Sequence, residues 1–215
     1  MLFDFSHYKT DKGPKGHSYQ RSYDSALNEK RIAAKNVLEI GSRRGSIRLW
    51  LDYFPNSTLY AWDLKHPWFW HDRLRYMKVN QSSEEQVLRA LKLMGCTLDV
   101  VIDDGPHTPR EQTMCFEVMF PYLSPNGVYI VEDLHCTDAN NEPQKSYLKF
   151  MGGADFSFRQ ILSRLQSGNV EPTMFLRNPK GLLEQVQSIH VDTGDAIRFK
   201  KYQRTPSEIA FVVKK

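Results

Sequence analysis

The sequence has few cysteines, no long apolar run and no strong excess of charge of one sign. Its cysteines, Cys96, Cys115 and Cys136, are odd in number, widely spaced and without a CxxC pair, which argues against a zinc knuckle or a disulfide framework. No apolar stretch approaches the ~18 residues of a membrane span, and no basic segment leads into an apolar one at the N-terminus. We therefore expect a protein of the reducing cytoplasm with no membrane partner.

The composition is that of one globular domain. The chain has 215 residues, 40% hydrophobic and 25% charged, with a formal net charge of +4. Such a mild basic bias suits an anionic ligand but falls short of the dense basic stripe of a duplex-binding protein, so nucleic acid is disfavoured as a partner. A homo-oligomer is compatible with these numbers. We expect a helical and loop segment at 1–35 and the main domain at 36–215.

Short β-branched runs alternate with amphipathic segments along the chain. Strands are predicted at 36–40, 58–62, 75–79, 98–104 and 128–133, and helices at 18–29, 46–54, 82–94 and 108–122. This alternation predicts right-handed crossovers and a doubly wound α/β sheet of the Rossmann-like type. Ser82 with Glu85, and Thr108 with Glu111, have the spacing of helix-capping boxes.

The C-terminal third has a different pattern. Asparagine, proline and glycine interrupt residues 135–160, which we interpret as an active-site cover with a short helix. A helix at 156–165 and closing strands at 186–192, 196–201 and 208–213 complete the expected fold.

Paired carboxylates end two of the predicted strands. Asp103 and Asp104 close one apolar run, and Glu132 and Asp133 close the next. Neighbouring strands lie roughly 4.8 Å apart, so these ends would bring several oxygens to one hard divalent cation at the carboxyl edge of the sheet. Asp103 and Asp104 point to opposite sides of their strand, so only one is expected at the metal. Ordinary turn chemistry is the alternative.

His107 directly precedes the predicted cap Thr108, close to Asp104. The positive N-terminus of a helix opposes protonation of a nearby imidazole, so His107 is a candidate general base. Mere solvation is the other interpretation. His17, His71 and His135 are weaker candidates.

A glycine turn, Gly41 to Gly45, joins the first predicted strand to a helix, and Asp63 ends the next strand about 20 residues later. This pattern favours an adenosine cofactor whose ribose is held by the carboxylate. Arg43 stands where a pyrophosphate site needs glycine, so we expect a cofactor with an amino-acid tail. Steric need alone also explains many such glycines.

Several motifs together resemble a known family. They are Val37-Leu38-Glu39-Ile40-Gly41, Asp63, Asn80-Gln81-Ser82, Val101 to His107, Val131-Glu132-Asp133, and the leading Thr10-Asp11-Lys12 with His17 and Tyr23. They are similar to those of class I S-adenosylmethionine-dependent methyltransferases, and within these to the metal-dependent sugar O-methyltransferases of the macrocin and mycinamicin type.

The resemblance implies a seven-stranded sheet, mostly parallel with an antiparallel closing strand, and transfer of a methyl group to a sugar hydroxyl, with rhamnose as one candidate. It implies S-adenosyl-L-methionine at Glu39, Gly41, Gly45, Asp63, Gln81 and Ser82, with Asp103 assigned to the same side. It further implies Mg²⁺ at Asp104, Glu132 and Asp133, with Asp104 and His107 as the catalytic residues and His107 as the base.

Three other functions stay open from the sequence. A small catechol-like diol could replace the sugar. Methylation of RNA ribose usually relies on a lysine-centred proton relay, and we expect no lysine beside Asp104 or Glu132. A non-catalytic module would bind metal or nucleotide without converting it.

Overall fold

The computed structural model describes residues 2–137, 157–169, 171–173, 176–193, 198–199, 202–203 and 207–215. Most of the expected active-site cover at 135–160 lies outside these residues. No helix within the described ranges is long and apolar enough to cross a membrane.

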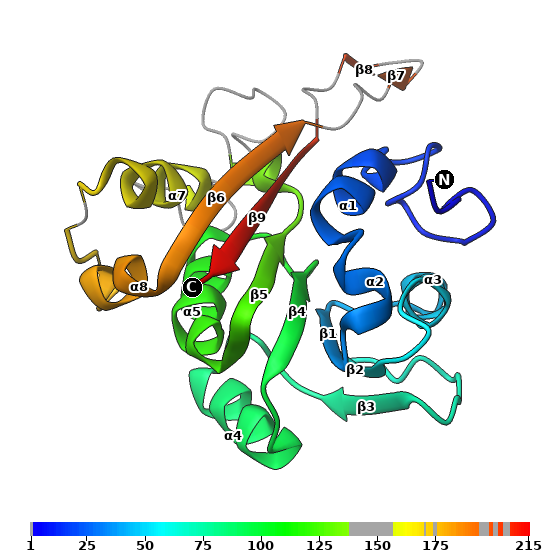
Figure 1. The fold of residues 1–215 in the computed structure, drawn as a ribbon. Helices are drawn as coiled ribbons and strands as arrows, with labels where there is room; N and C mark the ends of the chain where they lie inside the picture. The colour runs from blue at the N-terminus through cyan, green and yellow to red at the C-terminus, as the bar shows by residue number, and fades with distance from the viewer. Residues whose placement is uncertain are drawn as a thin grey trace.

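Seven strands form one twisted sheet in the order β3-β2-β1-β4-β5-β9-β6 (Figure 1). The pairs from β3 to β5 are parallel, and β9 runs antiparallel to both β5 and β6. The strands are β1 (Asn36–Ile40), β2 (Thr58–Asp63), β3 (Leu74–Lys78), β4 (Leu98–Asp103), β5 (Leu123–Val131), β6 (Val186–Thr193) and β9 (Glu208–Lys214). The predicted doubly wound sheet with one antiparallel closing strand is confirmed.

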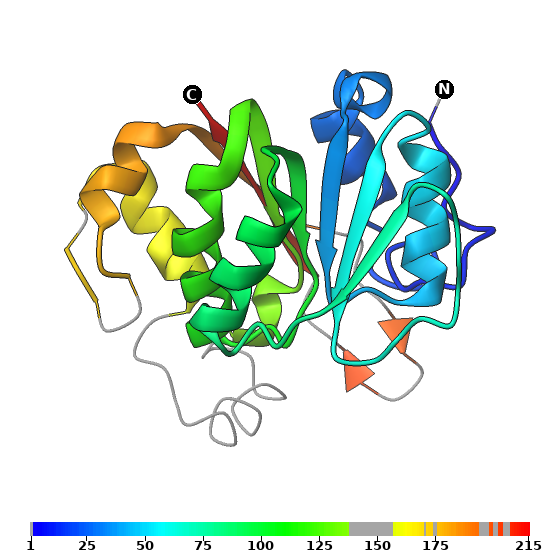
Figure 2. The same ribbon diagram turned by 90° about the horizontal axis from the view of Figure 1, so that it is seen from below.

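Helices cover both faces of the sheet. In Figure 2, α4, α5, α7 and α8 lie on one side of the strands, and α1 and α3 lie on the other. The helices are α1 (Gln20–Leu27), α2 (Lys30–Ala33), α3 (Arg44–Tyr53), α4 (Glu84–Met94), α5 (Pro109–Met119), α7 (Phe158–Ser167) and α8 (Pro179–Gln185), with 3-10 helices η1 (Phe120–Tyr122) and η2 (Leu134–Thr137).

Burial on both faces explains why the strands are continuously apolar. On β4, Val101 belongs to the core under α4 and α5, whereas Val100 and Ile102 belong to the core on the opposite face. Successive side chains of a strand alternate between faces, so a strand covered on both sides needs apolar residues throughout.

Three local predictions were wrong. Helix α4 is capped by Ser83, whose side chain accepts from the Gln86 amide, and not by Ser82. The strand predicted at 128–133 begins earlier, at Leu123, and its first residues contain an irregularity where the register with β4 shifts between Leu98 and Val100. Part of the expected closing strand at 196–201 is β7 (Arg198–Phe199), which pairs with its sequence neighbour β8 (Tyr202–Gln203) and not with the main sheet.

The first residues of the chain are part of one core. The Phe5 ring lies 6.0 Å, centroid to centroid, from each of Tyr23, Trp50 and Tyr53, and its side chain is fully buried. The N-terminal segment therefore packs against α1 and α3, and through them against the sheet.

We predict that Phe5→Ala lowers the free energy of unfolding by about 3–5 kcal/mol, the usual cost of removing a fully buried aromatic ring. Urea unfolding of the whole chain measures it. Phe69→Ala is the control, because Phe69 is only half-buried, and it should cost clearly less. Equal small losses in both variants would mean that the N-terminal segment adds nothing to the core.

Candidate functional site

A pocket of about 640 Å³ lies at the carboxyl ends of β1, β2 and β4, within the size range of small-molecule sites. Of the residues predicted from the sequence, its lining includes Gly41, Asp63, Gln81, Ser82, Asp104 and His107. Lys9, Thr10 and Asp11 of the N-terminal segment close one side. The strand order thus brings together residues that are far apart in sequence.

Both glycines of the turn are needed by the chain itself. Gly41 has φ +77°, and a Cβ there would lie 1.9 Å from the Asp104 carbonyl oxygen. A Cβ on Gly45 would lie 1.8 Å from the carbonyl oxygen of Lys9, and Gly45 is not part of the pocket lining. The steric explanation left open by the sequence therefore accounts for both glycines, although Gly41 still faces the pocket.

Glu39 lies beneath the pocket and is not part of its lining. Its fully buried carboxylate accepts hydrogen bonds from Ser46 Oγ at 2.8 Å and Trp50 Nε1 at 2.7 Å. Burial raises the pKa of Glu39 to about 7. Within the described structure, its contacts connect β1 to α3.

Asp103 is also fully buried and does not line the pocket. It accepts hydrogen bonds from Tyr129 Oη at 3.2 Å, the Gly105 amide at 3.3 Å and Gln81 Nε2 at 3.4 Å. Burial raises its pKa to about 6. Asp103 thus positions Gly105 and Gln81, which do line the pocket.

Sequence reasoning missed Lys12, whose fully buried ammonium group is surrounded by carboxylates. Lys12 Nζ donates to Asp104 Oδ2, and it lies 2.9 Å from Glu132 Oε1 and 3.8 Å from Glu39 Oε1. Burial opposes the charge, but the three carboxylates raise the pKa of Lys12 well above its ordinary value. The expectation that no lysine lies beside Asp104 or Glu132 was wrong. The signal available was the Thr10-Asp11-Lys12 motif, about ninety residues from Asp104 in sequence.

Glu132 shares the Lys12 ammonium group with Asp104 and is held by contacts of its own. Its carboxylate accepts hydrogen bonds from Lys12 Nζ and from Tyr23 Oη. The side chain is 1% exposed, and its oxygens are absent from the donor groups described next.

Asp104, His107 and Asp133 do converge. Each offers a ligand atom within 4.8 Å of the others, and His107 Nε2 lies 3.6 Å from Asp104 Oδ1 and 3.5 Å from Asp133 Oδ2. His107 and Asp133 both have left-handed backbones, with φ of 56° and 57°. Non-glycine residues adopt this conformation at a cost, and such residues cluster at functional sites.

Asp133 also lies between two further histidines. His17, Asp133 and His135 offer ligand atoms within 4.8 Å of one another, and Tyr19 Oη donates to Asp133 Oδ1 at 2.8 Å. Burial would raise the pKa of Asp133, but His107, His17 and His135 hold it below its ordinary value.

Two buried polar atoms at the pocket have no hydrogen-bond partner among the described residues. They are Trp62 Nε1 and His107 Nδ1. Buried donors and acceptors are nearly always paired in folded proteins. Each of these two atoms has almost no accessible surface, so neither faces the open pocket.

The sequence matches no protein family model. It is 28% identical over 160 residues to demethylmacrocin O-methyltransferase of Streptomyces fradiae, covering 68% of this chain and 40% of that protein. It is 32% identical over 126 residues to 8-demethyl-8-alpha-L-rhamnosyl tetracenomycin-C 2'-O-methyltransferase of Streptomyces olivaceus, covering 55% and 33% of the two chains. Mycinamicin VI 2''-O-methyltransferase of Micromonospora griseorubida is 30% identical over 138 residues, covering 60% and 34%. The resemblance seen in the motifs is confirmed.

Solved structures share the fold. MycE methyltransferase from the mycinamycin biosynthetic pathway, in complex with Mg, SAH and mycinamycin VI, superimposes with a TM-score of 0.73 at 23% identity, covering 99% of this chain and 55% of that one. The expected methyltransferase fold is thus confirmed. This chain spans well under two thirds of the length of these relatives.

We predict that Lys12→Met lowers the free energy of unfolding at neutral pH by about 3–5 kcal/mol, because it leaves buried carboxylates without a cation. Without Lys12, Asp104, Glu132 and Glu39 will hold protons more tightly in the folded state than in the unfolded chain. The stability of the variant should therefore fall more steeply than that of the wild type as pH rises. Urea unfolding at several pH values tests this, with the exposed Lys9→Met as control. A loss below about 1 kcal/mol would contradict the prediction.

The pKa of Asp103 predicts a second pH effect. The folded protein holds this proton up to pH about 6, whereas the unfolded chain releases it near pH 4. Its contribution to stability is therefore complete below about pH 4 and is lost as pH rises through about 6, a change of roughly 3 kcal/mol.

Asp103→Asn should remove this part of the pH dependence, whereas the exposed Asp72→Asn should keep it. Unfolding free energies measured between pH 4 and 8 would show the difference. Parallel curves for wild type and Asp103→Asn would mean that Asp103 ionises normally in the folded state.

Proposed function

We propose that this chain transfers the methyl group of S-adenosyl-L-methionine to a hydroxyl of a sugar, assisted by a divalent cation and by His107. The fold, the pocket at the carboxyl ends of β1, β2 and β4, and the similarity to sugar O-methyltransferases support the proposal. The single observation that carries it is the convergence of Asp104, His107 and Asp133 beside that pocket. The predicted cytoplasmic location and the boundary at residue 35 stay predictions.

The residues that line the pocket offer the polar groups that S-adenosyl-L-methionine needs. Asp63 ends β2 within the lining, where a carboxylate can accept hydrogen bonds from ribose hydroxyls,. Gly41, Gln81 and Ser82 also line the pocket; by the resemblance, Gly41 would lie against the methionine end of the cofactor and Gln81 and Ser82 on its adenine side. Asp103 supports Gln81 from below by a hydrogen bond, and Glu39 accepts one from Ser46, which also lines the pocket.

Asp104 and Asp133 suit a hard divalent cation such as Mg²⁺, which commonly uses one or two carboxylates and keeps several waters. When bound, such a cation lowers the pKa of a hydroxyl that it coordinates. Glu132, held by Lys12 and Tyr23, keeps Asp104 in place through their shared lysine. We propose that Glu132 supports the metal site through the lysine that it shares with Asp104.

His107 is positioned to take the proton from the acceptor hydroxyl. Its backbone is held in place by the start of α5, where Thr108 Oγ1 accepts from the Glu111 amide. Its ring lies between Asp104 and Asp133 and lines the pocket. The acceptor oxygen would then face the sulfonium methyl group at in-line contact distance, where positioning contributes most to the rate.

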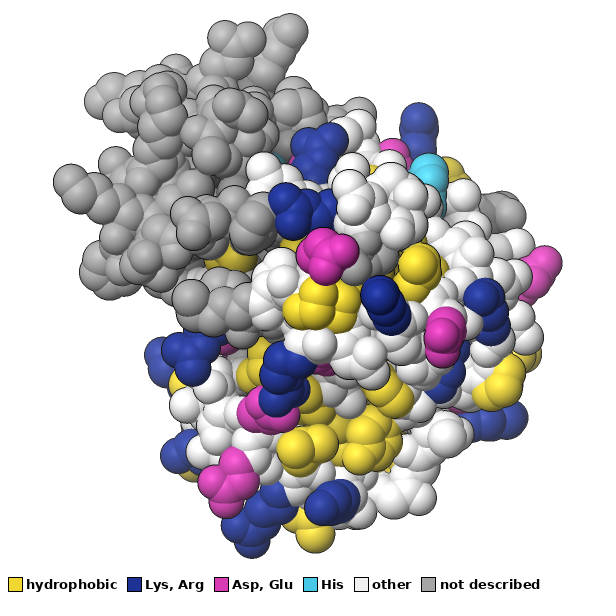
Figure 3. Space-filling view, turned by 90° about the vertical axis from the view of Figure 1, so that its left-hand side faces the viewer, with side chains coloured by type: hydrophobic (Ala, Val, Ile, Leu, Met, Phe, Trp, Pro, Cys, Tyr) yellow, Lys and Arg dark blue, Asp and Glu magenta, His cyan; other side chains and the backbone are white. Residues whose placement is uncertain are grey.

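A sugar is favoured over the alternatives by the names of the relatives, which include methyltransferases of a rhamnosyl tetracenomycin-C and of an L-olivosyl-oleandolide. The presence of Lys12 removes one argument against RNA ribose methylation. However, Lys12 is fully buried and absent from the pocket lining, so it does not reach a substrate there. On the face in Figure 3, basic and acidic side chains are interspersed with apolar ones, which does not favour a polyanion,. A catechol-like diol and a non-catalytic binding module are the remaining alternatives.

We predict that His107→Ala reduces turnover by about 10²–10⁴-fold and leaves binding of S-adenosylmethionine nearly unchanged, because only the proton transfer is lost. The assay incubates the protein with S-adenosylmethionine and a panel of rhamnosides and other glycosides, with Mg²⁺ or with chelator. Mass spectrometry detects addition of one methyl group, and calorimetry measures cofactor binding.

The exposed His190→Ala is the matched control and should behave like the wild type. Methylation of sugars that persists with chelator would contradict the role of the cation. Methylation only of catechols, or only of RNA, would replace the sugar as substrate. Unchanged turnover in His107→Ala would remove the histidine from the mechanism.

A further inference from the structure

We propose that His17, Asp133 and His135 form a second cation site, which binds a divalent ion that prefers imidazole ligands, such as Zn²⁺. The cluster lies beside the proposed Mg²⁺ site and shares Asp133 with it. The inference concerns ion binding alone, so it does not depend on the proposed function.

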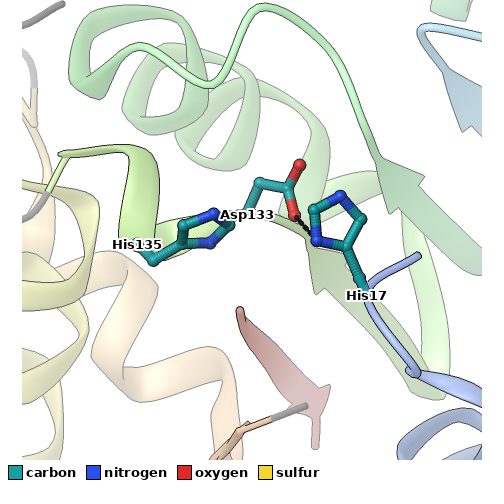
Figure 4. A group of neighbouring side chains, drawn as sticks. All are labelled: His17, Asp133 and His135. Atoms are coloured by element: carbon teal, nitrogen blue, oxygen red, sulfur yellow. Dashed lines mark ion pairs between the residues drawn. The ribbon is translucent and has the colours of Figure 1, made fainter. Parts of the chain in front are cut away.

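Three separate elements deliver the ligands. His17 comes from the loop before α1, Asp133 follows β5, and His135 lies in η2. Figure 4 shows the Asp133 carboxylate lying between the two imidazole rings, with its contact to His17 marked. All three residues are largely shielded from solvent: the side chains of His17 and Asp133 are 14% and 11% exposed, and His135 is 6% exposed.

The ligand atoms are close enough to be joined by one ion. They lie within 4.8 Å of one another, and His17 Nδ1 is 3.6 Å from Asp133 Oδ1. With Zn–N and Zn–O bonds of about 2.0–2.2 Å, the cluster needs to contract by about an ångström. The Ser207 hydroxyl contacts the same His17 nitrogen, so binding of an ion there requires this hydroxyl to turn aside.

Neighbouring groups orient these ligands, as expected of a metal site. The other nitrogen of the His17 ring, Nε2, lies 3.9 Å from Asp11 Oδ2, and metal-bound histidines usually direct their second nitrogen to a carboxylate or carbonyl. Tyr19 donates to Asp133 Oδ1 and also to the Glu208 carbonyl, which fixes the carboxylate. The Tyr19 ring stacks on that of His17 with centroids 5.3 Å apart.

The two proposed sites differ in their donor atoms, and therefore in the ions that they favour. Two imidazoles with one carboxylate suit Zn²⁺, Co²⁺ or similar ions, whereas carboxylate-rich sites with water suit Mg²⁺. Asp133 Oδ1 faces His17, and Asp133 Oδ2 faces His107. Each site therefore has its own oxygen of the shared carboxylate, and three protein ligands leave a fourth tetrahedral position open to water.

The test titrates Co²⁺, a spectroscopic substitute for Zn²⁺, into chelator-treated protein with Mg²⁺ in excess. We expect one equivalent of Co²⁺ to give visible absorption of tetrahedral or five-coordinate type, displaced by Zn²⁺. His17→Gln and His135→Gln should each weaken this binding by more than about tenfold, since loss of even an outer-shell partner costs that much. His107→Gln and the exposed His190→Gln should retain it.

Melting curves of the metal-free proteins show whether each variant folds. The wild type supplies a second readout: Zn²⁺ should shift the imidazole NMR signals of two histidines. No visible absorption in the wild type would overturn the proposal. So would loss of binding in His107→Gln with retention in His17→Gln and His135→Gln, or a shift of only one histidine signal, because these results would place the ion at Asp104, His107 and Asp133.

Discussion

The buried ammonium group of Lys12 is the contact on which the site depends. One cation from the N-terminal segment pairs with Asp104 and Glu132, which follow β4 and β5, and lies 3.8 Å from Glu39 on β1. Carboxylates packed this closely below a pocket would repel one another and lose their hydration, and a buried charge without a partner is costly. Lys12 offsets both effects. It also ties the first residues of the chain to the carboxyl edge of the sheet, which is where the pocket lies.

The N-terminal segment then determines the shape of that edge. Lys9 comes so close to α3 that only glycine fits at position 45, and the end of β4 comes so close to β1 that only glycine fits at position 41. Phe5 fills the core on the same face. Charge pairing, close backbone contact and apolar burial therefore act on one segment. Because these three interactions fix the N-terminal segment to the sheet, the segment can form one wall of the pocket without being a separate domain.

The sequence predicted well what depends on local pattern. Continuous runs of valine and isoleucine predicted the strands of the sheet, and the Thr108 cap predicted the start of α5. Both signals lie within a few neighbouring residues of the sequence. It could not predict where the carboxylates point, because this depends on partners distant in sequence. Glu39 and Asp103 turn to Trp50 and Tyr129, and Glu132 turns to Lys12. A polar motif such as Thr10-Asp11-Lys12 gives no sign that its lysine is buried until the fold is known.

Asp133 shows what such distant contacts produce. Its left-handed backbone and its hydrogen bond from Tyr19 fix the carboxylate with one oxygen toward His107 and the other toward His17. In the two proposed sites, a cation bound to one oxygen would withdraw charge from the other, so occupancy of either site would change the affinity of the other by the same factor. Two kinds of ion would then be coupled through a single side chain. The strength of that coupling is set by the rigidity of Asp133, since a carboxylate free to rotate would serve one ion at the expense of the other.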